Sequence, residues 1–173
     1  MKIFKEIMSY VVIILVVVLI RTFIVTPVRV DGSSMFPTLR NNDILLLKKY
    51  DKSIERFDMV VINYGKSKLV KRVIGLPGEK IRINITHVGS NTVSRIFING
   101  EVLEENYGYE NMIENGIAAN EITLGNDEYF VLGDNRNNSS DSRVIGVIKK
   151  SNIKGVTSFR LLPFGDFGSI DKN

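Results

Sequence analysis

An apolar run near the N-terminus limits what this chain can fold into more than any other feature. Residues 7–20 carry no charge, and after Arg21 the apolar character resumes through residue 25. A helix over residues 7–25 would have 19 residues, close to the roughly 20 that cross a bilayer core. The β-branched residues in 11–18 would suit a strand, but a lone segment in lipid must satisfy its own backbone hydrogen bonds, which favours a helix. The run therefore predicts a membrane anchor.

Two alternatives to an anchor remain open. A short basic start followed by an apolar core is also typical of a cleaved secretory signal, but residues 22–25 offer no small-x-small cleavage site. A buried core element is the other alternative. The orientation does not follow from charge, because Lys2 and Lys5 before the run are balanced by Arg21 and Arg29 after it.

The composition fits one globular domain in addition to the anchor. The chain has 173 residues, of which 44% are hydrophobic and 24% charged. The net charge of +4 is modest and scattered, which fits a solvated basic surface or attraction to an anionic membrane, and no nucleic-acid-binding motif accompanies it. The absence of cysteine excludes disulfides, cysteine nucleophiles and thiolate metal sites. We expect neither a metal nor a cofactor, and no nucleic-acid partner.

After Pro27 the pattern changes to short apolar or alternating runs, which predict a mainly β domain. Asn99-Gly100 between two apolar runs is a good hairpin signal. Residues 104–123 are acidic and rich in asparagine, and we expect an irregular surface excursion there. The predicted strands are residues 28–30, 44–47, 59–62, 69–74, 80–85, 93–98, 128–132, 145–148 and 157–161.

Ser34 is the first candidate for chemistry. It lies in residues 31–39, between Gly32 and a Met-x-Pro-Thr turn whose proline fixes φ near about −65°. A serine hydroxyl is a poor nucleophile until a base takes its proton. The single histidine, His87, lies in an unremarkable polar segment, so another residue type must activate Ser34 if it reacts.

Lys71 is a candidate for that base. On a strand it shares one face with Leu69 and Val73, so its ammonium group would lie among apolar neighbours. Burial without a carboxylate partner lowers the pKa of a lysine, and a neutral lysine can act as a general base. An ordinary solvated strand edge is the alternative for this segment.

The polar stretch 133–143 is the third unusual feature. Its eleven residues include no apolar side chain, although apolar runs lie on both sides. Asp134, Asp141, Arg136 and Arg143 allow ion pairs that would stiffen the loop. A solvent loop is the alternative. A calcium site is disfavoured, because the spacing departs from the EF-hand pattern and arginines lie between the carboxylates.

Residues 34–39, 71–78 and 133–143, in this order behind an apolar run, together resemble the bacterial type I signal peptidases. The resemblance covers nearly the whole chain. It is closest to the compact, single-anchor, Gram-positive type, because only about 54 residues separate Gly78 from Gly133. It implies one transmembrane helix followed by a β-rich catalytic domain like that of signal peptidases and repressor autoproteases.

The resemblance also implies roles for individual residues. Ser34 matches the nucleophile and Lys71 the general base of a Ser-Lys dyad. Ser139 matches the serine that orients the lysine, and Asp141 and Arg143 match the charged pair that holds the loop. The Ser34 amide would supply one oxyanion donor. Some relatives have a second, serine donor where this chain has Gly32, so the sequence departs from the family at that position.

The implied reaction is removal of signal peptides from secreted preproteins after small-x-small sites, through an acyl-enzyme. The substrate would add as a strand beside residues 29–31 and 68–70, with small pockets near Val30, Met35, Leu69 and Val70. Residues 1–6 would be cytoplasmic, 7–25 would span the plasma membrane in contact with lipid, and 26–173 would form the extracytoplasmic peptidase domain. The competing interpretations are a Ser-Lys autoprotease of the repressor-cleaving kind and an inactive membrane-tethered β adaptor.

Overall fold

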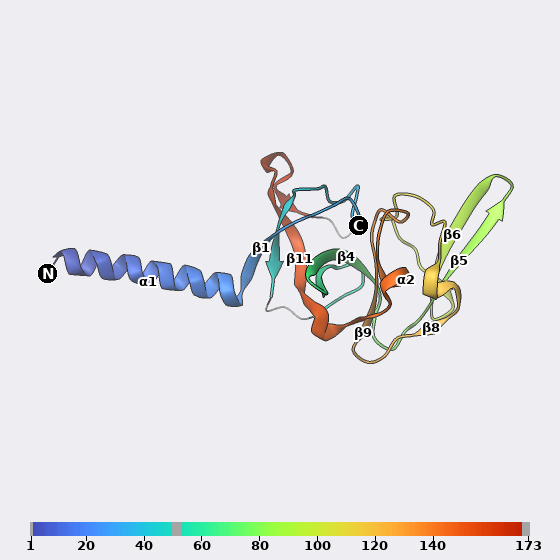
Figure 1. Cartoon of the computed structure of the whole chain (residues 1–173), viewed down its shortest axis with the longest axis horizontal. Coiled ribbons are helices and arrows are strands. Elements are labelled where there is room, and N and C mark those ends of the chain that lie inside the picture. The colour runs from blue at the N-terminus through green and yellow to red at the C-terminus, as the bar shows by residue number, and fades with distance from the viewer. Residues whose placement is uncertain (1, 50–52, 171–173) are drawn as a thin grey trace.

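Helix α1 (Lys2–Phe23) projects away from the rest of the protein, as Figure 1 shows for the computed structural model, which describes residues 2–49 and 53–170. Its segment Ile3–Phe23 has a mean hydropathy of 2.6, and none of it is buried against other parts of the protein. The helix is long and apolar enough to cross a membrane. It begins earlier than the predicted residue 7 and ends at Phe23, because the chain turns into strand β1 at Val25.

Directly after α1 the chain enters the larger of two sheets. Among the described residues it has eight strands in the order β1-β2-β11-β3-β4-β9-β10, with β12 paired to β11, and the pairs are antiparallel. Its strands are β1 (Val25–Arg29), β2 (Ile44–Lys48), β3 (Met59–Tyr64), β4 (Ser67–Gly75), β9 (Glu128–Leu132), β10 (Ile148–Lys149), β11 (Ile153–Leu162) and β12 (Gly168–Ser169).

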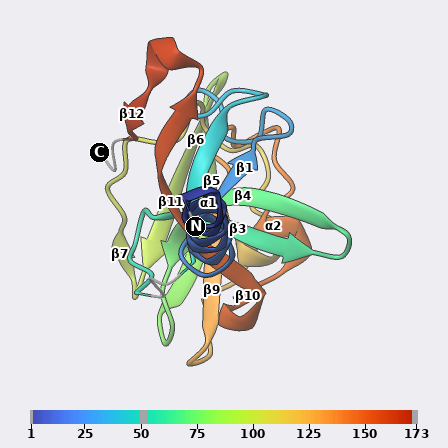
Figure 2. The same cartoon turned by 90° about the vertical axis from the view of Figure 1, so that its left-hand side faces the viewer.

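A smaller sheet lies at the end of the protein opposite α1 (Figure 1). In the described part of the chain it has the order β7-β6-β5-β8, formed by β5 (Lys80–Val88), β6 (Asn91–Ile98), β7 (Glu101–Val102) and β8 (Ile122–Thr123). Asn99 and Gly100 join β6 to β7 with φ angles of 51° and 88°, as a tight hairpin turn requires. The predicted hairpin and the mainly β fold are therefore confirmed. Figure 2, viewed along α1, shows both sheets beyond the end of that helix.

One apolar cluster joins the two sheets, and another packs the larger sheet against the turn that contains Ser34. Ile74 of β4 and Phe130 of β9 pack against Ile81 and Ile83 of β5, which joins the smaller sheet to the larger one. The second cluster lies beneath the Ser34 turn and includes Val30, Met35, Leu39, Val61 and Val70. Burial of each such side chain stabilises the fold by about 1.5–3 kcal/mol. The chain around Ser34 is therefore fixed by core packing.

The strand predicted over residues 145–148 is mostly wrong. A helical turn, α2 (Ser142–Ile145), occupies its start, and β10 begins only at Ile148. The Asp141 side chain accepts a hydrogen bond from the Arg143 amide and so caps α2, and Gly146 ends the turn with a φ of 84°. This local capping overrides the strand propensity of the β-branched residues.

Residues 104–123 are irregular, as predicted, but they are not a free surface excursion. They contain the short helix η1 (Gly116–Ala119) and β8, and they bury Tyr107, Met112 and Ala118. Met112 and Ala118 belong to the cluster between the two sheets. The segment therefore packs as a strap across the protein. The remaining short helices are η2 (Lys150–Asn152) and η3 (Phe164–Asp166).

Candidate active site

Ser34 lies in the turn that follows β1. The Leu39 amide donates to the Met35 carbonyl at 2.8 Å, and both side chains are buried in the cluster beneath the turn. The Gly32 amide donates to Asn41 Oδ1 at 2.9 Å, and Gly32 has a φ of 95°, which glycine adopts readily. The serine hydroxyl is thus presented from a rigid turn.

Lys71 lies on β4 and reaches the Ser34 hydroxyl. Its side chain is buried, with the residue only 2% exposed, as the strand pattern predicts. Its Nζ donates a hydrogen bond of 2.6 Å to Ser34 Oγ. Loss of hydration lowers the pKa of Lys71 from 10.5 to about 8; Asp141 and Asp134 oppose this shift, and Arg143 adds to it. A neutral lysine beside a serine hydroxyl is an arrangement that can generate an alkoxide.

Arg72, the next residue, points to the opposite face of β4 and holds Asp134. Its guanidinium donates to both carboxylate oxygens, at 2.9 and 2.7 Å, in a pair that is almost fully buried. Thr38 Oγ1 donates to the same carboxylate at 2.6 Å, and the Tyr107 ring lies 3.6 Å from the Arg72 guanidinium carbon. Asp134 is therefore held in an ion pair by a residue on the opposite face of β4 from Lys71.

The polar stretch 133–143 folds over the serine turn. The Asn135 amide donates to the Ser34 carbonyl at 3.1 Å, and Asn135 Nδ2 donates to the Ser33 carbonyl at 3.2 Å. Asn138 Nδ2 donates to Ser33 Oγ at 3.1 Å. Segments about a hundred residues apart in the sequence are thereby held together at the site.

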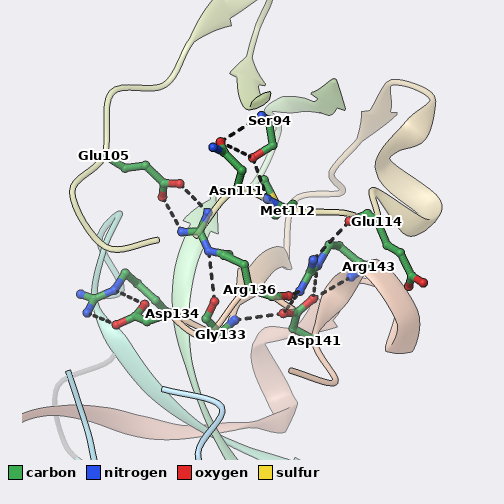
Figure 3. Close-up of polar contacts among 11 residues, drawn as sticks. Ser94, Glu105, Asn111, Met112, Glu114, Gly133, Asp134, Arg136, Asp141 and Arg143 are labelled. Carbon is green, nitrogen blue, oxygen red and sulfur yellow. Dashed lines mark hydrogen bonds and ion pairs between the residues drawn. The ribbon is translucent and has the colours of Figure 1, made fainter. Parts of the chain in front are cut away.

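Asp141 and Arg143 form the buried pair that fixes this loop (Figure 3). Arg143 donates to both carboxylate oxygens of Asp141, at 2.8 and 2.9 Å, and also to the carbonyls of Arg136 and Glu114. The Gly133 amide donates to Asp141 Oδ2 at 3.0 Å. The internal ion pairing that we expected is confirmed for these two residues, and it ties the two ends of the loop together.

Arg136 pairs outside the loop, with Glu105 of the strap (Figure 3). The two guanidinium nitrogens donate to the two carboxylate oxygens at 2.5 and 2.7 Å, and Arg136 Nε donates to the Gly133 carbonyl at 3.1 Å. Asn111 adds a second attachment, since its carbonyl accepts from Asn137 Nδ2 at 3.0 Å. The strap therefore supports the loop from outside the motif residues.

Ser139 lies beside the Ser34 and Lys71 pair, but its expected contact with the lysine is not present. Its hydroxyl oxygen is buried and forms no hydrogen bond among the described residues. It packs against Gly133, where an added Cβ would lie 2.2 Å from Ser139 Oγ and 2.4 Å from the Ser34 carbonyl oxygen. The orienting role of Ser139 stays a prediction.

An open cleft of about 480 Å³ contains the serine and the lysine. Leu69 lines it, whereas Val30, Met35 and Val70 lie together in the buried cluster below the serine turn. The structure thus gathers the four residues predicted for substrate pockets near the cleft, with one on its surface. The cleft is lined by Asp31, Gly32, Ser33, Ser34, Leu69, Lys71, Asn137, Asn138, Ser139 and Ser140.

The carboxylates of the calcium alternative are already occupied by arginines. Asp134 pairs with Arg72 and Asp141 with Arg143, so neither presents free oxygens to a cation. Within the described residues, no group of three or more histidine, aspartate or glutamate side chains is placed to hold a metal ion.

Reasoning from the sequence missed two supports of the site. The partner of Asp134 is Arg72, and the alternation of β4 already placed that arginine opposite Lys71. The partner of Arg136 is Glu105, in a segment without periodicity, and no signal in the sequence pointed to it. In both pairs, a charged residue outside residues 133–143 binds a residue of opposite charge within them.

A buried lysine of lowered pKa, hydrogen-bonded to a serine in an open cleft of a β-rich protein, is an arrangement in which a lysine can act as the base for a serine hydroxyl. Residues 3–162 match the family model described as Signal peptidase, peptidase S26. The chain therefore belongs to the signal peptidase S26 family, and its enzyme class is signal peptidase I.

Two relatives from Bacillus agree with this assignment. The chain is 33% identical to Signal peptidase I S of Bacillus subtilis (strain 168), over 91% of this chain and 88% of that protein. It is 36% identical to Signal peptidase I P of Bacillus subtilis subsp. natto, with the same shares covered. A crystal structure of a signal peptidase I from Enterococcus faecalis V583 is 31% identical, covering 60% of this chain and 96% of that one, with a TM-score of 0.44.

Proposed function

We propose that Ser34 is the nucleophile and Lys71 the general base with which this enzyme removes signal peptides from secreted preproteins. The observation that carries the proposal is the 2.6 Å contact between Lys71 Nζ and Ser34 Oγ. Burial lowers the pKa of Lys71 to about 8, so a useful fraction of the lysine is neutral near physiological pH. The one histidine, His87, bonds Thr92 at 3.2 Å on the exposed β5–β6 hairpin and plays no part in this pair.

The reaction has two half-reactions. Neutral Lys71 accepts the Ser34 proton as Oγ attacks the carbonyl carbon of the scissile peptide bond, and the resulting ammonium protonates the leaving amine of the mature protein. Lys71, neutral again, then takes a proton from water, which attacks the acyl-enzyme ester and releases the signal peptide while the proton returns to Ser34. One lysine therefore serves as base and acid in turn.

The backbone amide of Ser34 is the proposed donor to the oxyanion. Among the described residues this amide donates to no other group, which leaves it available to the cleft. Gly32 has no side chain, so it cannot supply the hydroxyl that some relatives have at this position as a second donor to the oxyanion.

The substrate is proposed to bind as an added strand between residues 29–31 and 68–70. Strand β1 is an edge strand that pairs only with β2, in the part of the chain that the structure describes. Strand β4 pairs with β3 along residues 67–72, whereas β9 pairs only with its end from Arg72 to Gly75. Both strands therefore have unpaired backbone groups facing the cleft. The buried side chains of Val30, Met35 and Val70, together with Leu69 of the cleft, are proposed to form shallow pockets that accept only small substrate side chains.

The proposed topology places residues 1–6 in the cytoplasm, residues 7–25 in the membrane and residues 26–173 outside the cytoplasm. Helix α1 supports a single membrane anchor, since its apolar side chains are exposed along its length. Anchoring raises the effective concentration of the enzyme near membrane-held signal peptides. Lipid is thus the proposed partner of the anchor.

The test is cleavage of a purified preprotein by the full chain reconstituted in lipid. We expect the wild-type enzyme and Ser90→Ala, a change on an exposed turn, to release the mature protein, and Ser34→Ala to release none. Mass measurement of the products would locate the cut after a small-x-small site. Cleavage by Ser34→Ala at the wild-type rate would overturn the nucleophile assignment.

A further inference from the structure

Two exposed apolar side chains flank a small pocket next to the cleft. Val144 on α2 is 68% exposed and Ile113 of the strap is 64% exposed. Between them lies a pocket of about 110 Å³. We call Ile113, Val144 and this pocket the α2 face. The pocket is lined by Ile113, Glu114, Gly116, Arg136, Asn137, Ser139, Arg143 and Val144.

The α2 face is continuous with the catalytic cleft. Asn137 and Ser139 line both the cleft and the pocket. Asn137 also fixes the boundary, because its Oδ1 accepts from the Ile113 amide at 3.0 Å and its Nδ2 donates to the Asn111 carbonyl at 3.0 Å. A chain that leaves the cleft over residues 137–139 therefore arrives at the α2 face.

The direction in which the substrate crosses the cleft determines whether its signal peptide or its mature part reaches the α2 face. The apolar core of a signal peptide lies in the membrane, as α1 does, so the signal peptide must approach from the α1 end. Figure 1 shows α2 on the far side of β4, which carries Lys71, from α1. The residues after the scissile bond therefore continue toward α2.

The chemistry of the α2 face favours an apolar side chain. The two guanidinium groups at its base are already paired, Arg136 with Glu105 and Arg143 with Asp141. They exert little net attraction on an acidic residue, whereas Ile113 and Val144 gain by being covered.

We infer that Ile113 and Val144 bind an apolar side chain among the first residues of the mature protein and so influence which preproteins are cut efficiently. The inference rests on the proposed function and extends it from the signal peptide to the mature side of the cleavage site. It makes the α2 face a determinant of specificity, separate from the pockets for small residues.

The test compares two preproteins that differ only in carrying leucine or serine at the mature positions just after the first. For each enzyme, kcat/KM is measured in lipid for both substrates, and the leucine-to-serine ratio is reported. We expect the ratio to exceed one for the wild-type enzyme and to fall about fivefold in Val144→Asn and in Ile113→Asn, mainly through KM. Val88→Asn is the matched control, since Val88 is 63% exposed at the far end of β5, and it should keep the wild-type ratio.

The leucine-to-serine ratio of kcat/KM distinguishes a failure of this inference from a failure of the proposed function. If the wild-type enzyme cuts both substrates and Val144→Asn and Ile113→Asn keep its ratio, the α2 face has no such role and only this inference fails. An equal fall in Val88→Asn would also overturn it. If the wild-type enzyme cuts neither substrate, the proposed function fails, and the inference fails with it.

Discussion

The amide of Asn135 donates a hydrogen bond of 3.1 Å to the carbonyl oxygen of Ser34. This bond joins the polar loop to the serine turn at the serine itself, so the position of Ser34 depends on both segments. The loop is fixed in turn by Asp141 and by the strap through Glu105. The position of Ser34 therefore depends on the packing of the serine turn, the polar loop and the strap against one another.

Lys71→Arg should abolish preprotein cleavage while the protein still folds and inserts. A guanidinium group stays protonated at any pH the protein tolerates, so it cannot take the Ser34 proton. Lys71→Ala should be equally inactive, and Lys66→Ala, on the exposed β3–β4 turn, should cleave normally. Mature product would be quantified on gels, with folding checked by circular dichroism. Full activity in Lys71→Ala would contradict the assignment of Ser34 and Lys71 as a catalytic dyad.

The pH dependence of cleavage should follow the neutral form of Lys71. Because burial lowers the pKa of Lys71 to about 8, the neutral lysine is the minor form below pH 8 and the major form above it. We expect kcat/KM to rise about tenfold per pH unit below pH 8 and to level off above it. A profile measured with a stable peptide substrate checks this. An inflection near 6.5, the usual value for histidine, would point to a different base.

Glu105→Gln should lower kcat by about tenfold with a smaller effect on KM. The change leaves the buried Arg136 guanidinium without its carboxylate, and Arg136 holds the Gly133 carbonyl beside Ser139 and Ser34. Glu104→Gln, at the exposed neighbouring position, is the matched control. Steady-state kinetics of both variants, with thermal unfolding alongside, distinguish positioning from general instability. Equal losses in the two variants would argue against a positioning role for Glu105.

Gly133→Ala should reduce cleavage by at least a hundredfold. The new Cβ would lie 2.2 Å from Ser139 Oγ and 2.4 Å from the Ser34 carbonyl oxygen, so the loop or the serine turn must shift. A displacement of reacting groups by about 1 Å can lower the rate about a hundredfold. Gly165→Ala adds the same methyl group where no atom lies within 4 Å and should behave as wild type. Single-turnover cleavage would measure the chemical step directly. Wild-type rates in Gly133→Ala would show that the loop adjusts freely.

The sequence predicted the parts of the fold and site that depend on local pattern. Strand alternation placed Lys71 among apolar neighbours, and Asn99-Gly100 specified a hairpin, because both signals reside in a few adjacent residues. The helical turn at residues 142–145 was missed, because the capping by Asp141 outweighs the propensity of the residues that follow it. The pair of Glu105 and Arg136 could not be predicted, since it joins positions 31 residues apart through an irregular segment.

Neighbouring positions on β4 carry two cations that the protein uses in opposite ways. Arg72 forms an ion pair with Asp134, whereas Lys71, facing the other side, is proposed to lose its charge when it acts as the base. One strand thus carries an ion pair on one face and the proposed base on the other, and the Asp134 charge still acts on Lys71 through the strand. Any change that released Asp134 from Arg72 would strengthen a negative field that already favours the lysine ammonium. Such a change is expected to raise the pKa of Lys71 and so to shift the pH dependence of cleavage to higher pH, without altering the serine, the lysine or the substrate.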